Sequence, residues 1–195
     1  MRTRLSTLVV LALLFAGLHV AAAAVPSPKP SPKATVTPNP TMAALTRLAG
    51  RDLDVAVMLE LLARFEEDIE ITYAATLNAD HPPLLQWNQK MIERKSGQIK
   101  TLLELLKEAN AAPGRRGVNV VTPEVKQMRQ LKGGPLERKF LPLMIDRFET
   151  NATIASLPAG KGASEGLKTL AASISKTERQ EIAMLKAWLK EWYGR

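Results

Sequence analysis

The sequence has no cysteine, only two histidines in 195 residues, and few aromatic side chains, which make up 5% of the chain. Without cysteine there is no disulfide framework, no thiol nucleophile and no lipid-modified cysteine near the N-terminus. The few aromatic residues and the many alanines, leucines, glutamates and lysines disfavour an all-β sandwich and favour helices. The composition therefore predicts an all-α protein that is stabilised by packing alone.

The first 24 residues have the pattern of a secretory signal peptide. Two arginines precede an apolar run from Leu8 to Leu18, and the small residues before Val25 satisfy the Ala-x-Ala cleavage rule. This run is shorter than the roughly 20 residues that span a bilayer. We expect cleavage after Ala23 or Ala24 and export to the periplasm or the extracellular space, with no membrane span left. An uncleaved anchor is the alternative.

A proline-rich segment follows the signal peptide. Residues 25–41 alternate proline with serine, lysine and threonine. This composition favours an extended, polyproline-like linker, and a proline-rich ligand for a partner domain is the alternative. The chain is thus divided into a signal peptide (1–24), a linker (25–41) and a single folded domain (42–195).

An internal repeat organises the folded domain. Positions 48–108 match positions 131–191 at a constant offset of 83 without a gap, and thirteen of the pairs are identical. The identical pairs include two runs of three residues, Arg-Phe-Glu at 64–66 and 147–149, and Leu-Lys-Glu at 106–108 and 189–191. This self-similarity predicts a duplicated helical hairpin, with residues 109–130 as the connector between the two copies.

Apolar residues recur at three- and four-residue spacing in both copies, which is the period of an amphipathic helix. In the first copy, the pattern predicts a helix over about 51–78 and a second helix that begins at Pro82. In the second copy, Pro142 predicts a kink or a late helix start, and Ser164 opens the last helix after a break at 160–162. Four such helices predict a ferritin-like four-helix bundle with a long crossover connector.

The connector differs from the two copies in charge. It carries a predicted short helix at 122–129, and Glu124 is the only acid between residues 112 and 134. Its basic side chains form a candidate anion-binding patch for phosphate or an acidic wall polymer, and a solvated basic loop is the alternative. We do not expect nucleic acid as a partner, because no aromatic residues are interleaved. The patch consists of Arg115, Arg116, Lys126, Arg129 and Lys132.

Three segments of the second copy resemble a bacterial family, domain of unknown function 305. Residues 131–141 resemble its glycine-containing lead-in, and residues 143–155 resemble its helix signature Met-Ile-x-His-His-x-x-Ala-Ile-x-Met-Ala. Residues 178–189 resemble its closing helix, Gln-x-x-Glu-Ile-x-x-Met-x-x-Trp-Leu. The first copy is a weaker version of the same pattern. The resemblance implies an exported, ferritin-like helical domain of a kind often associated with copper handling.

The sequence departs from that family at its metal-binding residues. Arg147-Phe148 in the second copy and Arg64-Phe65 in the first stand where the family has two adjacent histidines. The positions of the family's two methionines hold Ile154 and Leu185 in the second copy, and Ile71 and Leu102 in the first. Imidazole and thioether suit copper, whereas a guanidinium stays charged and repels a cation. We therefore predict that the metal site is lost, with no cofactor bound.

The two equivalent arginines have two interpretations. They either hold a buried polar network, or bind an anion, where the family holds metal, or they lie at the edge of the core with their heads solvated or paired. Within its own helix, Arg64 can reach Glu60 or Asp68. Arg147 has only the neutral Asn151 within reach. The edge position is the favoured interpretation.

Other candidate residues have simple structural interpretations. His81 is the only histidine outside the signal peptide and precedes two prolines, so we expect a turn residue. Glu66, Glu67 and Glu70 lie off the apolar stripe and predict a solvated face. No Glu-x-x-His is present for a di-iron site. Most methionines are expected in the core, from the set Met58, Met91, Met128, Met144 and Met184.

The sequence contains no Ser/His/Asp set and no phosphate-binding loop, so we do not expect an enzyme. We predict an exported, non-enzymatic binding or interaction protein whose partner is an unknown envelope protein or an anionic polymer. One alternative is weak binding of copper or another metal, which requires some of Met58, Met144, Met184 and Glu181 to point together into a cavity. The other alternative is an anion- or wall-binding module built on the connector.

Overall fold

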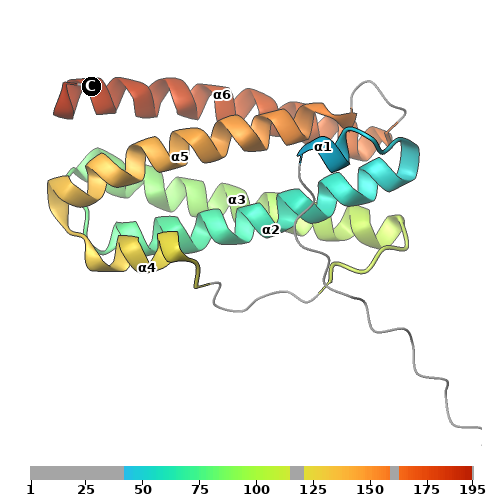
Figure 1. Ribbon diagram of the computed structural model, residues 1–195, viewed down its shortest axis with the longest axis horizontal. Helices are drawn as coiled ribbons and strands as arrows, with labels where there is room; N and C mark the ends of the chain where they lie inside the picture. The colour runs from blue at the N-terminus through green and yellow to red at the C-terminus, as the bar shows by residue number, and fades with distance from the viewer. Residues whose placement is uncertain (1–41, 115–120, 159–162, 195) are drawn as a thin grey trace, which may run out of the picture. The chain divides into compact units, whose positions relative to one another are not determined.

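The computed structural model describes residues 42–114, 121–158 and 163–194, which form six α-helices and no strand (Figure 1). The signal peptide, the linker, Arg115, Arg116 and the break predicted at 160–162 lie outside the described residues. The helices are α1 (Met42–Leu45), α2 (Gly50–Thr76), α3 (Pro82–Glu108), α4 (Pro123–Gln130), α5 (Gly133–Ser156) and α6 (Glu165–Tyr193). The predicted all-α class is confirmed.

Local sequence signals set three of the helix starts. Pro82 opens α3, where its missing N–H costs no helical hydrogen bond. The hydroxyl of Thr122 accepts a hydrogen bond from the Val125 N–H at 3.3 Å and caps α4. The hydroxyl of Ser164 accepts one from the Leu167 N–H at 3.4 Å and caps α6. These three starts agree with the sequence predictions.

Two glycines begin α2 and α5. Gly50 and Gly133 both have φ of 55°, in the left-handed region that favours glycine. The N–H of Gly133 also donates to the carbonyl of Asn78 at 2.7 Å. This bond joins the start of α5 to the turn between α2 and α3.

The late helix start predicted at Pro142 is wrong. Helix α5 begins at Gly133 and contains Pro142. Pro142 is exposed, and a proline on the solvent side lets water hydrate the carbonyl that lost its helical partner. The helix therefore continues on both sides of the proline.

The four long helices lie alongside one another (Figure 1). The most extensive contact is between α5 and α6, followed by that between α2 and α3. Helix α2 also contacts α5 and the short α4, whereas the contact between α3 and α6 is small. Within the described residues, no helix is both long enough and apolar enough to span a bilayer.

The apolar core consists of two clusters, and each draws on all four long helices. The first cluster includes Phe65 and Ile99, and the second includes Trp87 and Phe148. The buried methionines are core residues, as predicted, and are Met58, Met91, Met128 and Met144. Met184 is partly buried and packs against the second cluster.

Candidate functional site

A layer of polar side chains lies between the two apolar clusters. At its centre lies one buried residue from each long helix, namely Asp68 of α2, Lys95 of α3, Asn151 of α5 and Glu178 of α6. In each helix, the core residues on one side of this position belong to the first cluster and those on the other side to the second. Such a position requires internal partners, because burying an unpaired charge is costly.

The four residues form two direct contacts and a bridge between them. Asn151 Nδ2 donates to Asp68 Oδ2 at 2.9 Å, and Lys95 Nζ donates to Glu178 Oε1. Lys95 Nζ also lies 3.4 Å from Asp68 Oδ2. One ammonium group therefore serves two buried carboxylates.

Arg64 and Arg147 flank these four residues, and we call all six the polar layer. Arg147 is 7% exposed. Its Nε donates to Asp68 Oδ1, and its Nη2 donates to Glu67 Oε2 at 2.9 Å and to the Arg64 carbonyl at 3.2 Å. Arg64 Nε donates to Asn151 Oδ1 at 2.6 Å. All six side chains thus belong to one connected network.

The favoured edge position is wrong for Arg147, which is buried and bound to acids of another helix. Helical spacing predicts partners only within one helix, so it could not predict that Arg147 of α5 binds acids of α2. Arg64 Nη1 does lie 3.9 Å from Glu60 Oε1. Glu67, predicted on a solvated face, is half-buried and paired with Arg147.

The contacts in the polar layer follow the offset of the sequence repeat. Three of them join residues that are 83 positions apart, namely Asp68 with Asn151, Lys95 with Glu178, and Arg64 with Arg147. The bond from Arg64 to Asn151 is related by the same offset to the bond from Arg147 to Asp68. Contacts of this kind are typical of an approximate twofold axis.

The two Arg-Phe positions surround an ammonium group. Phe65 and Phe148 are fully buried. Lys95 Nζ lies 3.6 Å from the ring centroid of Phe65 and 5.1 Å from that of Phe148. These cation–π contacts, together with the carboxylates, replace the hydration that the buried ammonium has lost.

The two acids of the layer, Asp68 and Glu178, have pKa values shifted in opposite directions. Burial alone would raise the pKa of Asp68, but Lys95 and Arg147 hold it below its usual value. Burial raises the pKa of Glu178 to about 7, even though Lys95 opposes this shift. Glu178 Oε2 has no hydrogen-bond partner among the described residues. Asp68 is therefore firmly ionised at neutral pH, whereas Glu178 is close to half-protonated.

The donor set of the layer does not fit copper. Three cations lie in it, and both of its carboxylates are engaged by them. Across the described ranges, no cluster of three or more histidine or acidic side chains could hold a metal. The methionines of the copper alternative are divided, because Met58 lies in the first cluster and Met144 and Met184 in the second. Glu181 is paired with Arg94 at 2.8 Å.

A second polar cluster joins three parts of the chain around Glu137. This carboxylate is fully buried and accepts hydrogen bonds from the backbone N–H groups of Asp80 and His81, at 2.7 and 2.9 Å, and from the Tyr193 hydroxyl at 2.5 Å. His81 Nδ1 lies 2.5 Å from Glu137 Oε2. The His81 ring stacks on Trp192 with centroids 4.0 Å apart. His81 was predicted as a turn residue, and the structure adds these contacts, which no local pattern indicates.

The candidate anion-binding patch is only partly described. Arg115 and Arg116 lie outside the described residues, and Lys126, Arg129 and Lys132 are exposed. Arg129 Nη2 lies 3.7 Å from Glu70 Oε2 of α2. One of the three described cations is therefore already paired with an acid.

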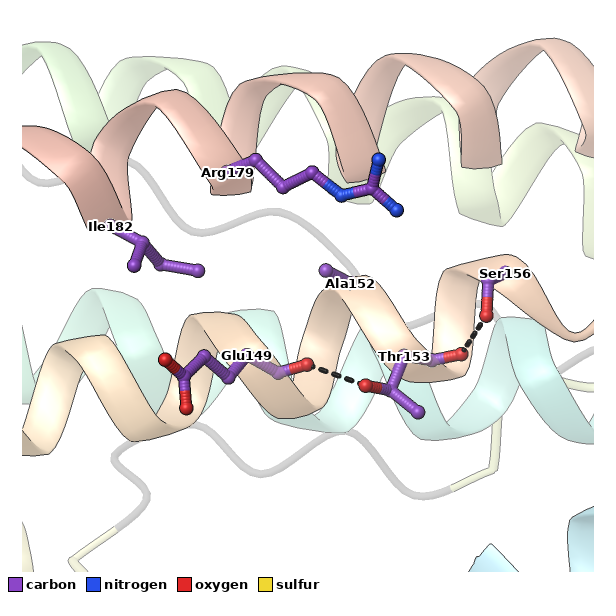
Figure 2. Close-up of a pocket in the computed structure, with 6 residues that line it drawn as sticks. All are labelled: Glu149, Ala152, Thr153, Ser156, Arg179 and Ile182. Carbon is purple, nitrogen blue, oxygen red and sulfur yellow. Dashed lines mark hydrogen bonds between the residues drawn. The ribbon is translucent and has the colours of Figure 1, made fainter.

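A groove of about 280 Å³ lies between α5 and α6, and none of the predicted site residues lines it (Figure 2). Arg179 contributes to the α6 side of the groove, and its side chain runs along that helix. The hydroxyls on the α5 side donate to their own helix, Thr153 to the Glu149 carbonyl at 2.8 Å and Ser156 to the Thr153 carbonyl at 2.6 Å. The lining residues are Glu149, Ala152, Thr153, Ser156, Arg179 and Ile182.

Comparison with known proteins places this fold. The family model for Domain of unknown function (DUF305) matches residues 108–189. CopM in its Cu(I)-bound form is 18% identical with a TM-score of 0.63, covering 72% of this chain and 97% of CopM. A DUF305 protein of Streptomyces coelicolor, described as secreted, is 15% identical with a TM-score of 0.64, covering 73% of this chain and 93% of that one. No curated protein matches the sequence. The family model thus matches less than half of the chain, and the two solved structures are similar to it in fold.

Proposed function

We propose that this chain is an exported, non-enzymatic binding or interaction protein of the DUF305 type, in which an internal ionic layer has replaced the metal site. The observation that carries the proposal is the environment of Lys95. Among the residues aligned with the family's paired histidines, Phe65 and Phe148 pack around this ammonium and Arg147 binds its carboxylate partner Asp68. Both carboxylates of the layer are already paired with its own cations, so they do not form a free ligand set for a metal ion.

The same proposal includes the architecture predicted from the repeat. The four long helices form a ferritin-like four-helix bundle made of two related hairpins, α2–α3 and α5–α6. The contacts at an offset of 83 support this relation. The equal φ of Gly50 and Gly133 at the two hairpin starts also supports it.

Export to the periplasm or beyond is supported by the signal-peptide pattern of residues 1–24 and by the likeness to a secreted protein. Cell fractionation with mass spectrometry of the mature N-terminus tests it. We expect the protein in the periplasmic or culture fraction, with an N-terminus at Ala24 or Val25. An intact Met1 in the cytoplasm would contradict export.

A copper-binding role is the second candidate, and the likeness to Cu(I)-bound CopM favours it. Titration of the purified protein with Cu(I), Cu(II) and Zn(II), followed by calorimetry and thermal melting, distinguishes the two. We expect no stoichiometric site, because the layer offers no free donor set. Submicromolar binding with a raised melting temperature would establish a metal site and overturn the proposal.

A gain-of-function variant tests whether the Arg-Phe pair stands in place of a metal-binding histidine pair. Arg147→His with Phe148→His restores adjacent imidazoles at one aligned position. The matched control places the same pair at exposed positions of α6, Ala172→His with Ser173→His. We expect the first variant, once shown to be folded by circular dichroism, to bind Cu(I) more tightly than the control. Equal binding would mean that these positions are not the origin of the missing site.

A further inference from the structure

The contact between α3 and α6 differs from the other long-helix contacts. It is less extensive than that between α5 and α6, and it includes both polar and apolar groups. Lys95 bonds to Glu178 in the buried part. Glu181 pairs with Arg94 at 2.8 Å and accepts a hydrogen bond from the Trp87 indole nearer the surface. By contrast, α5 and α6 pack over an extensive surface. Ion pairs and hydrogen bonds therefore help to hold α3 against α6, beside apolar contacts such as that of Trp87 with Trp188.

Glu178 is the residue of this contact with the poorest partners. It is 3% exposed, and only one of its two carboxylate oxygens has a partner among the described residues, at Lys95. Lys95 is also shared with Asp68 at 3.4 Å. A buried ionised carboxylate with one unpartnered oxygen loses hydration that a shared ammonium restores only in part. Water reaches that oxygen when α3 and α6 move apart.

We propose that the α3–α6 contact is a proton-controlled seam, which stays closed when Glu178 is protonated and opens locally to water when Glu178 is ionised. The geometry of the shared ammonium and the bare oxygen carries this inference. It does not depend on whether the protein binds copper. It assigns to the chain a conformational response to the pH of its surroundings.

The charges around Glu178 come from all four long helices. Lys95 and Arg94 of α3 favour its ionised form, and Asp68 of α2 disfavours it. Arg147 of α5 is bound to Asp68, and Glu181 of α6 is paired with Arg94. Because the pKa of Asp68 is lowered, Asp68 keeps its charge while Glu178 titrates.

The sign of the response follows from the two pKa values of Glu178. In the closed seam the pKa is about 7, against 4.5 for the hydrated side chain. The closed state therefore holds its proton more tightly, and opening becomes easier as pH rises through this window. The equilibrium constant for opening rises about sixfold per pH unit between pH 5 and 7 and levels off above pH 8.

Amide hydrogen exchange of the full chain, read by mass spectrometry and corrected for intrinsic rates, tests the seam. We expect protection around Lys95 and Glu178 to fall about thirtyfold from pH 5.5 to 8.5. Protection in α5 around Leu141, a buried residue of the second cluster, should stay unchanged. Uniform loss in all helices, or no pH dependence at the seam, would overturn the proposal.

Variants at Glu178 separate the seam from general effects of pH. Glu178→Gln keeps an oxygen for Lys95 but cannot ionise, so we expect full protection at pH 8.5. Glu178→Leu, which is also uncharged, serves as a second variant should the amide fail to fold. Glu191→Gln, at an exposed position of α6, is the control and should exchange like the native chain. A pH-dependent seam in the folded Gln or Leu variant would refute the role of Glu178.

Discussion

At the scale of single residues, Gly50 and Gly133 have the same backbone angle but different surroundings. A Cβ on Gly50 would meet nothing within 4 Å, whereas one on Gly133 would lie 2.3 Å from Asp80 Oδ2. Asp80 is exposed, and its carboxylate is the far end of a flexible side chain. The left-handed φ, rather than the clash, should therefore dominate the cost of adding a Cβ at either position.

We expect Gly50→Ala and Gly133→Ala to lower the free energy of unfolding by similar amounts, about 1 to 2 kcal/mol each. Urea unfolding of both variants measures this. The double variant Asp80→Ala with Gly133→Ala is the control for the clash. A much larger loss for Gly133→Ala, recovered in the double variant, would show that the Asp80 carboxylate is held in place.

Some residues of the polar layer could be predicted from the sequence, and others could not. The repeat singled out Arg64 and Arg147 as equivalent positions, and the structure places both in one network. Lys95, Asp68 and Glu178 were not assigned to a site, since a charged residue inside a helical pattern is typical of a solvated face. Their burial depends on partners contributed by other helices, which helical spacing does not encode.

At the scale of elements, the cluster at Glu137 joins the start of α5, the turn before α3 and the end of α6. Burial alone would raise the pKa of Glu137, but hydrogen bonds from Tyr193 and His81 lower it below its usual value. A lowered pKa means that the ionised carboxylate stabilises the fold above about pH 4.5. This contribution is lost as the pH falls below that value toward the pKa of the folded state.

We therefore expect Glu137→Gln to be less stable than the native chain at pH 7 and to approach it at pH 3. Thermal melting between pH 3 and 7 measures the two curves. Glu149→Gln, at an exposed acid of the same helix, should keep the acid-induced drop of the native chain. If Glu137→Gln and the native chain fall in parallel, the carboxylate does not supply this acid-sensitive stability.

The helices themselves were largely predictable because their signals are local. Pro82, Thr122 and Ser164 are terminal residues of established chemistry, and each begins or caps the helix expected. The late helix start predicted at Pro142 was wrong, because whether a proline interrupts a helix depends on which side of the helix faces water. The Glu137 cluster was not predictable, because its partners lie 56 or 57 positions away in the chain.

At the scale of the whole molecule, the polar layer fixes how the hairpins meet. Apolar packing specifies helix alignment less strictly than directional polar contacts do. Hydrogen bonds between Asp68 and Asn151 and between Lys95 and Glu178 exist in one alignment only. Buried polar groups of this kind can specify a single arrangement at a cost in stability. We infer that the layer has this role here.

Lys95 is the residue on which the layer depends most, because it is paired with both buried acids. Lys95→Met leaves Asp68 without its ammonium and Glu178 with no described partner. We expect the variant to lose about 3 to 5 kcal/mol of unfolding free energy at pH 8, the usual effect of removing one member of a buried ion pair.

Adding Glu178→Met to Lys95→Met should restore about 1 to 3 kcal/mol, because it removes the carboxylate left with no partner. Asp68 keeps Arg147 and Asn151 in this double variant. Urea unfolding of the native chain, both single variants and the double variant gives the coupling energy between the two positions. Additive losses would show that water, rather than Lys95, satisfies Glu178, and the layer would then place no constraint on the pairing of α3 with α6.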